Sequence, residues 1–204
     1  MDRVKSPQPL PPLEFHPVTL ERWGDLEKLF GEHGASSGCW CMWWRLPRAQ
    51  YRAQYGQEGG QKNKEALKAI VDSGPPPGLL AYAEGEAIAW CSVAPREHFA
   101  GLERSRSLKR VDDAPVWSVV CFFVAKPFRS RGVMVPLLTA AVEYARAHGA
   151  KIVEGYPVEP TQRLTGDRGY TGVVSAFRKA GFVEVLRRGT RPIMRCSLDV
   201  PRSS

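Results

Sequence analysis

The chain has 204 residues, of which 43% are apolar and 25% are charged. These values are typical of one globular domain and exclude a collagen-like, coiled-coil or wholly disordered chain. The longest apolar-rich run, residues 116–124, is far shorter than the roughly 20 residues of a membrane-spanning helix, and the N-terminus lacks the apolar stretch of a signal peptide. We expect a soluble, cytoplasmic protein.

The chain is basic and contains few cysteines. Its 29 Lys and Arg residues against 21 Asp and Glu residues give a net charge of +8, which favours an anionic partner such as nucleic acid, a phosphorylated cofactor or an acidic substrate. The 5 cysteines stand at irregular spacings, unlike a disulfide framework, so we expect a reducing compartment.

Hydrophobic periodicity and turn signals predict a single domain over residues 15–198, between a proline-rich arm over 1–14 and a tail over 199–204. In chain order, the predicted elements are a helix over 20–30, a weak helix over 64–71, strands over 79–83 and 87–94, a strand over 116–124, a helix over 133–148, a strand over 151–156, a helix over 171–179, and strands over 182–187 and 193–198. This order predicts an α/β (α+β) fold, with a mixed and mostly antiparallel central sheet flanked by helices. Residues 97–113 are rich in charged residues and aperiodic, which predicts a surface loop.

The most informative unit is the strand over 116–124, the turn over 125–132 and the helix that follows. The strand is almost continuously apolar, which indicates a central position in the sheet. A basic, glycine-containing turn between a strand and a helix directs unpaired N–H groups and a positive helix end at one point, as a diphosphate site requires. Taken alone, such a unit also fits an ordinary surface connection.

The residues of this unit resemble the acyl-CoA signature of the GNAT superfamily of N-acetyltransferases. Residues 121–134 read CFFVAKPFRSRGVM, and the turn of that superfamily reads Arg/Gln-x-x-Gly-x-Gly/Ala. Segments 89–96, 154–157 and 177–182 resemble further pieces in the superfamily's order, so that the resemblance spans about residues 15–198. It implies an acetyl-CoA-dependent N-acetyltransferase, with acetyl-CoA as co-substrate, in which an amine of a small molecule or peptide attacks the thioester directly.

The resemblance also implies a set of cofactor-binding residues. Backbone groups of Phe123 and Val124 would contact the pantetheine and the thioester. The pyrophosphate would be held by Arg129, Ser130, Arg131, Gly132, Val133 and Met134. Because the family prefers Gly or Ala where this chain has Met134, the methionine side chain must point away from the phosphates.

Two catalytic groups that the family often uses are missing. The strand over 116–124 has no glutamate to act as base, and Phe177 stands where the family often has a tyrosine acid. We expect Glu154 to replace the base, directly or through water, with Tyr156 on the same strand face and Tyr170 as candidate acids. A solvated carboxylate and two buried aromatic rings are the simpler interpretations.

The aromatic segment Cys39–Arg45 admits several roles. Its Cys-x-Cys pair lacks the second spaced pair of a structural zinc site, so no metal is expected. Trp40 and Trp43 either pack beneath the first helix or line the acceptor pocket, because this segment usually borders the acceptor site in the superfamily. Arg45 is a candidate anchor for an acceptor carboxylate or phosphate.

Two other functions fit the sequence less well. The missing glutamate and tyrosine leave open a non-catalytic acyl-CoA-binding or regulatory module. The arginines of residues 103–110 also fit a basic nucleic-acid-binding protein, although no helix-turn-helix, zinc finger or RNA-recognition motif is present. No membrane partner is expected, and dimers are common in the superfamily.

Overall fold

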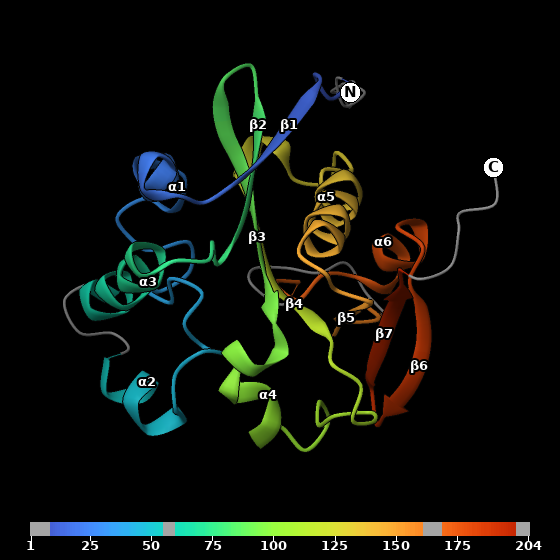
Figure 1. Ribbon diagram of the computed structural model, residues 1–204. Coiled ribbons are helices and arrows are strands. Elements are labelled where there is room, and N and C mark those ends of the chain that lie inside the picture. The colour runs from blue at the N-terminus through green and yellow to red at the C-terminus, as the bar shows by residue number, and fades with distance from the viewer. Residues whose placement is uncertain (1–8, 55–59, 161–168, 199–204) are drawn as a thin grey trace, which may run out of the picture.

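The computed structural model describes residues 9–54, 60–160 and 169–198 (Figure 1). Its helices and strands are β1 (Leu13–Pro17), α1 (Trp23–Phe30), α2 (Arg48–Gln54), α3 (Gln61–Ser73), β2 (Gly78–Ala83), β3 (Glu86–Pro95), α4 (Ala100–Arg104), β4 (Trp117–Val124), α5 (Met134–Ala147), β5 (Ile152–Gly155), α6 (Val174–Lys179), β6 (Val183–Arg188) and β7 (Arg191–Ser197). Short 3-10 helices are η1 (Leu20–Arg22), η3 (Arg96–His98) and η4 (Lys126–Phe128).

The strands form one seven-stranded sheet in the order β1-β2-β3-β4-β5-β7-β6. Neighbouring strands are antiparallel except β4 and β5, which are parallel. A parallel pair needs a crossover connection, and α5 provides it. The predicted mixed, mostly antiparallel sheet flanked by helices is therefore confirmed.

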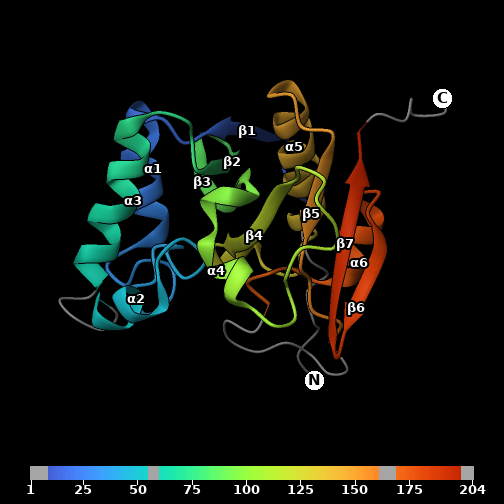
Figure 2. The same ribbon diagram turned by 60° about the horizontal axis from the view of Figure 1, so that its bottom comes forward.

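Helices cover both faces of the sheet, α1 and α3 on one face and α5 and α6 on the other (Figures 1 and 2). The apolar stripe of α5, which includes Leu137, Leu138 and Ala141, is fully buried against the sheet. Burying a leucine side chain stabilises a fold by about 1.5–3 kcal/mol. On the opposite face, Leu26 and Phe30 of α1 pack on Trp90 and other residues of the sheet. None of the described helices combines the length and hydropathy needed to cross a bilayer.

The structure differs from the sequence prediction at its short elements. Strand β1 begins at Leu13, inside the expected proline-rich arm, and pairs with β2. Helix α2 was not predicted. The expected surface loop over 97–113 contains η3 and α4, and it buries Phe99 and Leu102 completely. Elements of one or two turns carry too little periodicity to be recognised, and tertiary packing stabilises them. Residues 1–8 of the arm and the tail over 199–204 lie outside the described residues.

Candidate functional site

Strand β4 contains a β-bulge at Val120. Ser92 of β3 is opposite Cys121, whereas Val93 is opposite Val119, so Val120 is an extra residue in β4. The bulge turns Val120 and Cys121 toward the same face, whereas Val119 packs on the α5 side. A bulge re-aims side chains and leaves a backbone position unpaired. The apolar run of the sequence conceals this shift because both faces of the strand are apolar.

Beside the bulge, β4 and β5 separate. Their pairing ends at Val119 and Gly155, and β4 continues to Val124. Since Ala125 N–H donates to Ile88 O of β3, the alternation of an antiparallel ladder directs the backbone groups of Phe122 and Val124 away from β3. The N–H of Phe122 donates to Tyr170 O at 2.6 Å. The open edge therefore carries Phe122 and Val124, and the alternation directs the backbone groups of Phe123 to β3 instead.

The turn after β4 brings basic side chains to the start of α5. Ser130 and Gly132 have left-handed backbone conformations, with φ of 60° and 86°. Arg129 Nε donates to Val124 O at 2.8 Å, and Arg131 Nη2 donates to Pro9 O at 2.8 Å. A Cβ on Gly132 would meet no atom within 4 Å. In α5 itself, Val135 N–H donates to Gly132 O at 3.3 Å and Pro136 has no N–H. The donors for an anion at this position are therefore the N–H groups of the turn and of Met134.

Met134 opens α5, and its side chain packs toward α6. A Cβ built on Gly172 would lie 3.4 Å from Met134 Sδ, and Met134 contacts the buried cluster between α5, α6 and the sheet. This is the direction that phosphate binding at the turn requires. The departure of Met134 from the family pattern leaves the backbone at the turn accessible.

Glu154 is buried in a network of charged groups on the face opposite α5. Its carboxylate is 1% exposed; Oε1 accepts hydrogen bonds from Arg96 Nη1 at 3.0 Å and from Tyr156 Oη at 2.7 Å. Oε2 accepts from Arg195 Nε at 2.7 Å. A carboxylate with both oxygens bonded to cations in the interior is poorly placed to collect a proton from an incoming amine. This placement does not favour the expected role of Glu154 as base.

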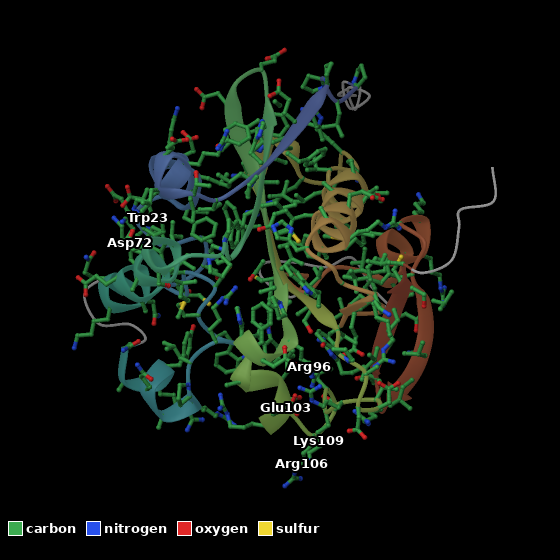
Figure 3. All side chains as sticks on the ribbon, viewed as in Figure 1. Trp23, Asp72, Arg96, Glu103, Arg106 and Lys109 are labelled. Carbon is green, nitrogen blue, oxygen red and sulfur yellow. The ribbon has the colours of Figure 1, made fainter. Side chains whose placement is uncertain are left out.

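The arginines of this network have further partners, which fix their positions. Arg96 Nε donates to Glu103 at 2.9 Å, and Figure 3 shows these two side chains beside α4. Arg195 donates to Asp112 at 2.6 and 3.0 Å, and this hydrogen bonding lowers the pKa of Asp112. Although Arg195 stands on the last strand of the chain, it is only 9% exposed.

The two candidate tyrosines lie in different surroundings. Tyr156 is 1% exposed, and its hydroxyl also contacts Arg96 at 2.6 Å and Ser118 at 2.8 Å. Burial raises the pKa of Tyr156, and Glu154 adds to the shift. Tyr170 is 36% exposed and contacts the open edge of β4 through its carbonyl. Of the two, Tyr170 lies at the edge where β4 separates from β5.

The aromatic segment after α1 divides between core and surface. Trp40 is 3% exposed and stacks on Trp23 with a centroid distance of 6.0 Å, which makes it a core residue. Trp43 is 39% exposed, packs edge-on against Tyr51 at 5.0 Å and lines a pocket between α2 and α4. Arg45, 9% exposed, donates from Nη2 to Pro77 O at 3.0 Å. The structure thus separates Trp40 from the two other expected substrate-binding residues.

Three buried groups meet where this segment touches β4. Cys41 Sγ lies 3.2 Å from Cys121 Sγ at the bulge and accepts a hydrogen bond from Trp90 Nε1 at 3.1 Å. The contact with Cys41, with burial, raises the pKa of Cys121 well above its ordinary value. Within the described ranges, no three His, Cys, Asp or Glu residues are arranged to hold a metal ion. The segment therefore packs directly on the bulged strand.

Comparison with known proteins gives a family and a fold. The family model described as "Acetyltransferase (GNAT) family" matches residues 40–165, which is more than half of the chain. Among solved structures, PaiA N-acetyltransferase from Thermoplasma acidophilum in complex with coenzyme A is 13% identical, with a TM-score of 0.52 over 92% of this chain and 99% of that chain.

Two further solved structures have the same fold at similar identity. A putative arylalkylamine N-acetyltransferase 7 from the mosquito Aedes aegypti is 13% identical, with a TM-score of 0.53 over 92% of this chain and 88% of that chain. An acetyltransferase of the GNAT family from Streptococcus pneumoniae is 12% identical, with a TM-score of 0.53 over 92% and 99%. A search of curated protein sequences finds no match.

Proposed function

Because this chain belongs to the GNAT family of acetyltransferases, we propose that it transfers the acetyl group of acetyl-CoA to a primary amine of a small molecule. The observation that carries the proposal is the separation of β4 from β5 beside the bulge at Val120, directly before the basic turn at the start of α5. A thioester on the open edge of β4 and a diphosphate at the turn would lie along one continuous path.

The residues of this path match the needs of the co-substrate. N–H groups of the turn and of Met134, with Arg129 and Arg131, supply positive charge for the pyrophosphate. The N–H of Val124 faces the open edge and is available to an amide or thioester oxygen. The N–H of Phe122 donates to Tyr170 O, so residues near Tyr170 must shift before Phe122 can donate to a bound substrate.

The chemistry needs few side chains. The neutral amine attacks the thioester carbonyl carbon, the oxyanion forms against fixed N–H donors of β4, and the C–S bond breaks to release the CoA thiolate. Since Glu154 is enclosed by Arg96, Arg195 and Tyr156, we assign it a positioning role, and the amine loses its proton to water. Tyr170, at the open edge, is our candidate for returning a proton to the thiolate.

Two measurements test this function. Calorimetric titration with acetyl-CoA should give saturable binding, with a short DNA duplex as the control polyanion. With amines added, free thiol should appear at a rate that depends on the acceptor. Binding without acceptor-dependent thiol release across a broad amine panel would leave only an acyl-CoA-binding module. Absence of acetyl-CoA binding would overturn the proposal.

A further inference from the structure

Arg45 holds a positive charge in the interior without a carboxylate beside it. Its side chain is 9% exposed, and within the described part of the chain no Asp or Glu forms an ion pair with it. By contrast, the other buried arginines, Arg96 and Arg195, are paired with Glu154, Glu103 and Asp112. An uncompensated buried charge is costly to a fold. Arg45 is thus an exception among the buried arginines.

The hydrogen-bonding capacity of Arg45 is also unfilled. One guanidinium nitrogen donates to Pro77 O at 3.0 Å, and Nε is buried with no partner among the described residues. The guanidinium lies over the ring of Phe99, 4.4 Å from its centroid, which fixes its plane. Burial lowers the pKa of Arg45 to about 10, so it remains charged at neutral pH. A planar, charged fork with free donors matches a carboxylate in shape and charge.

Arg45 lies beside the bulged strand. Phe99, beneath its guanidinium, packs in one cluster with Val120 and Cys121. Cys41 is close enough to Arg45 to influence the pKa of the guanidinium, and its sulfur contacts that of Cys121. Arg45 therefore lies against the cluster that contains the bulge, on the face opposite α5. An acceptor anchored there would approach the open edge of β4 from the side opposite the basic turn over residues 125–132.

A pocket adjoins this position, and one of its lining residues has a second hydrogen-bond donor without a partner among the described residues. Its lining among the described residues is Trp43, Trp44, Arg48, Tyr51, Gly101, Arg104 and Ser105, none of which is acidic. The indole N–H of Trp44 is buried without a partner in the described chain, and Gly101 N–H donates to Trp44 O at 2.8 Å, which holds α4 against the segment that carries Arg45. The aromatic walls suit an apolar or aromatic side chain of the acceptor.

We infer that the acceptor is a small amine that also carries a carboxylate, such as an α-amino acid, and that Arg45 binds this carboxylate. The inference rests on the proposed acetyl transfer and specifies its substrate class. It assigns the aromatic pocket to the side chain of the acceptor. The anion offsets the buried charge that the fold itself leaves unpaired.

The test compares acceptors that differ only in the anion. Thiol release is measured with the common amino acids and with the matching amino alcohols, in which a neutral hydroxymethyl group replaces the carboxylate. The amino acids should be preferred in kcat/KM. The Arg45→Gln variant should lower kcat/KM for the best amino acid by roughly tenfold to a hundredfold, the usual effect of losing a hydrogen bond to a charged group. The kcat/KM for the matching amino alcohol and the affinity for acetyl-CoA should not change. Arg106→Gln, an exposed change of equal charge (Figure 3), is the control.

A competition experiment does not depend on the folding of a variant. With the wild-type protein, a carboxylate that lacks the amine, such as 3-phenylpropanoate, should compete with the amino acid and not with acetyl-CoA. Equal turnover of amino acids and amino alcohols would overturn the inference and leave the acetyl transfer intact. Turnover of neither series, with acceptor-dependent thiol release from other amines, would overturn the inference and leave the acetyl transfer intact. Failure to bind acetyl-CoA would instead remove the proposed function at its first step.

Discussion

Arg96 and Glu154, 58 residues apart in the chain, form an ion pair at 3.0 Å in which both side chains are 1% exposed. Such a pair connects the end of β3 to β5 beneath the separation of β4 and β5. Without its partner, Arg96 would keep only the ion pair with Glu103 and Glu154 only the one with Arg195, so the loss of either group should destabilise the fold. The pair fixes the strands around the site without facing a substrate itself.

Glu154→Gln should reduce stability more than it alters catalysis. Removing the carboxylate charge leaves Arg96 and Arg195 less compensated, and we expect a loss of about 3 kcal/mol in the free energy of unfolding, measured by denaturant titration. The comparison variant Tyr156→Phe keeps the carboxylate charge but removes a hydroxyl that contacts Glu154, Arg96 and Ser118, and it should cost about 1–3 kcal/mol. In folded Glu154→Gln protein, the dependence of kcat on pH should match the wild type. A lost ionisation in that profile would identify Glu154 as the base instead.

Gly132 and Gly149 form a matched pair at the two ends of α5. Both have positive φ, 86° and 81°, and a Cβ on either would meet nothing within 4 Å. Substitution by alanine should therefore cost a similar backbone strain of about 1 kcal/mol at each position. Only Gly132→Ala should also weaken the binding of acetyl-CoA, measured by calorimetry, because only Gly132 lies in the basic turn. Equal affinities in the two variants would argue against the turn as the phosphate site.

Tyr170→Phe tests the proposed acid. The variant keeps the backbone carbonyl that accepts from Phe122 N–H, so stability should change little. If Tyr170 protonates the thiolate, kcat should fall by roughly a hundredfold, with KM for acetyl-CoA nearly constant. The matched control is Tyr144→Phe on α5, at a tyrosine that packs on Trp117 and His148; it should change neither kcat nor its pH dependence. An unaltered kcat in Tyr170→Phe would leave the thiolate to depart without an acid.

The pKa of His98 should report the charge on Arg45. Burial first, and then the Arg45 guanidinium, lower the pKa of His98, and Glu97 opposes the shift. Since the folded pKa lies below the unfolded value of about 6.5, protonation favours the unfolded state. The stability that comes from the neutral form of His98 is fully present at pH values above the unfolded-state pKa. It is lost as the pH falls through the folded-state pKa. Arg45→Gln should raise the folded pKa, as followed by NMR of the imidazole protons.

A bound carboxylate should act in the same direction on His98, because it offsets the charge of Arg45. Titration of the wild-type protein in the presence of 3-phenylpropanoate should therefore give a higher His98 pKa than titration without it. Arg106→Gln should leave the pKa of His98 where it is. A His98 pKa that responds to neither Arg45→Gln nor the carboxylate would show that Arg45 and its ligand do not act on this histidine.

The order of the longer strands and helices along the chain could be predicted from sequence. A long periodic segment such as that of α5 shows which of its side chains are buried. The bulge at Val120 could not, because an apolar run carries no mark of a shifted register. Nor could the burial of Glu154 and Arg195. Arg96, which pairs with Glu154, stands directly before the segment interpreted as a surface loop, and Asp112, which pairs with Arg195, lies inside that segment. Arg45 was expected as an anion anchor, but its lack of a carboxylate partner is a property of the folded arrangement.

The three residue pairs between β4 and β5 are the ladder that joins the two halves of the described sheet, β1–β4 and β5–β7. This seam is short and parallel, the less stable kind of pairing, whereas the hairpins on either side are longer and antiparallel. Local opening of the fold should be most frequent at the pairing of β4 with β5. Amide hydrogens of residues 153–155 should therefore exchange with solvent sooner than those of β3. The least stable pairing of the sheet thus adjoins the opening at which we propose that the two substrates meet.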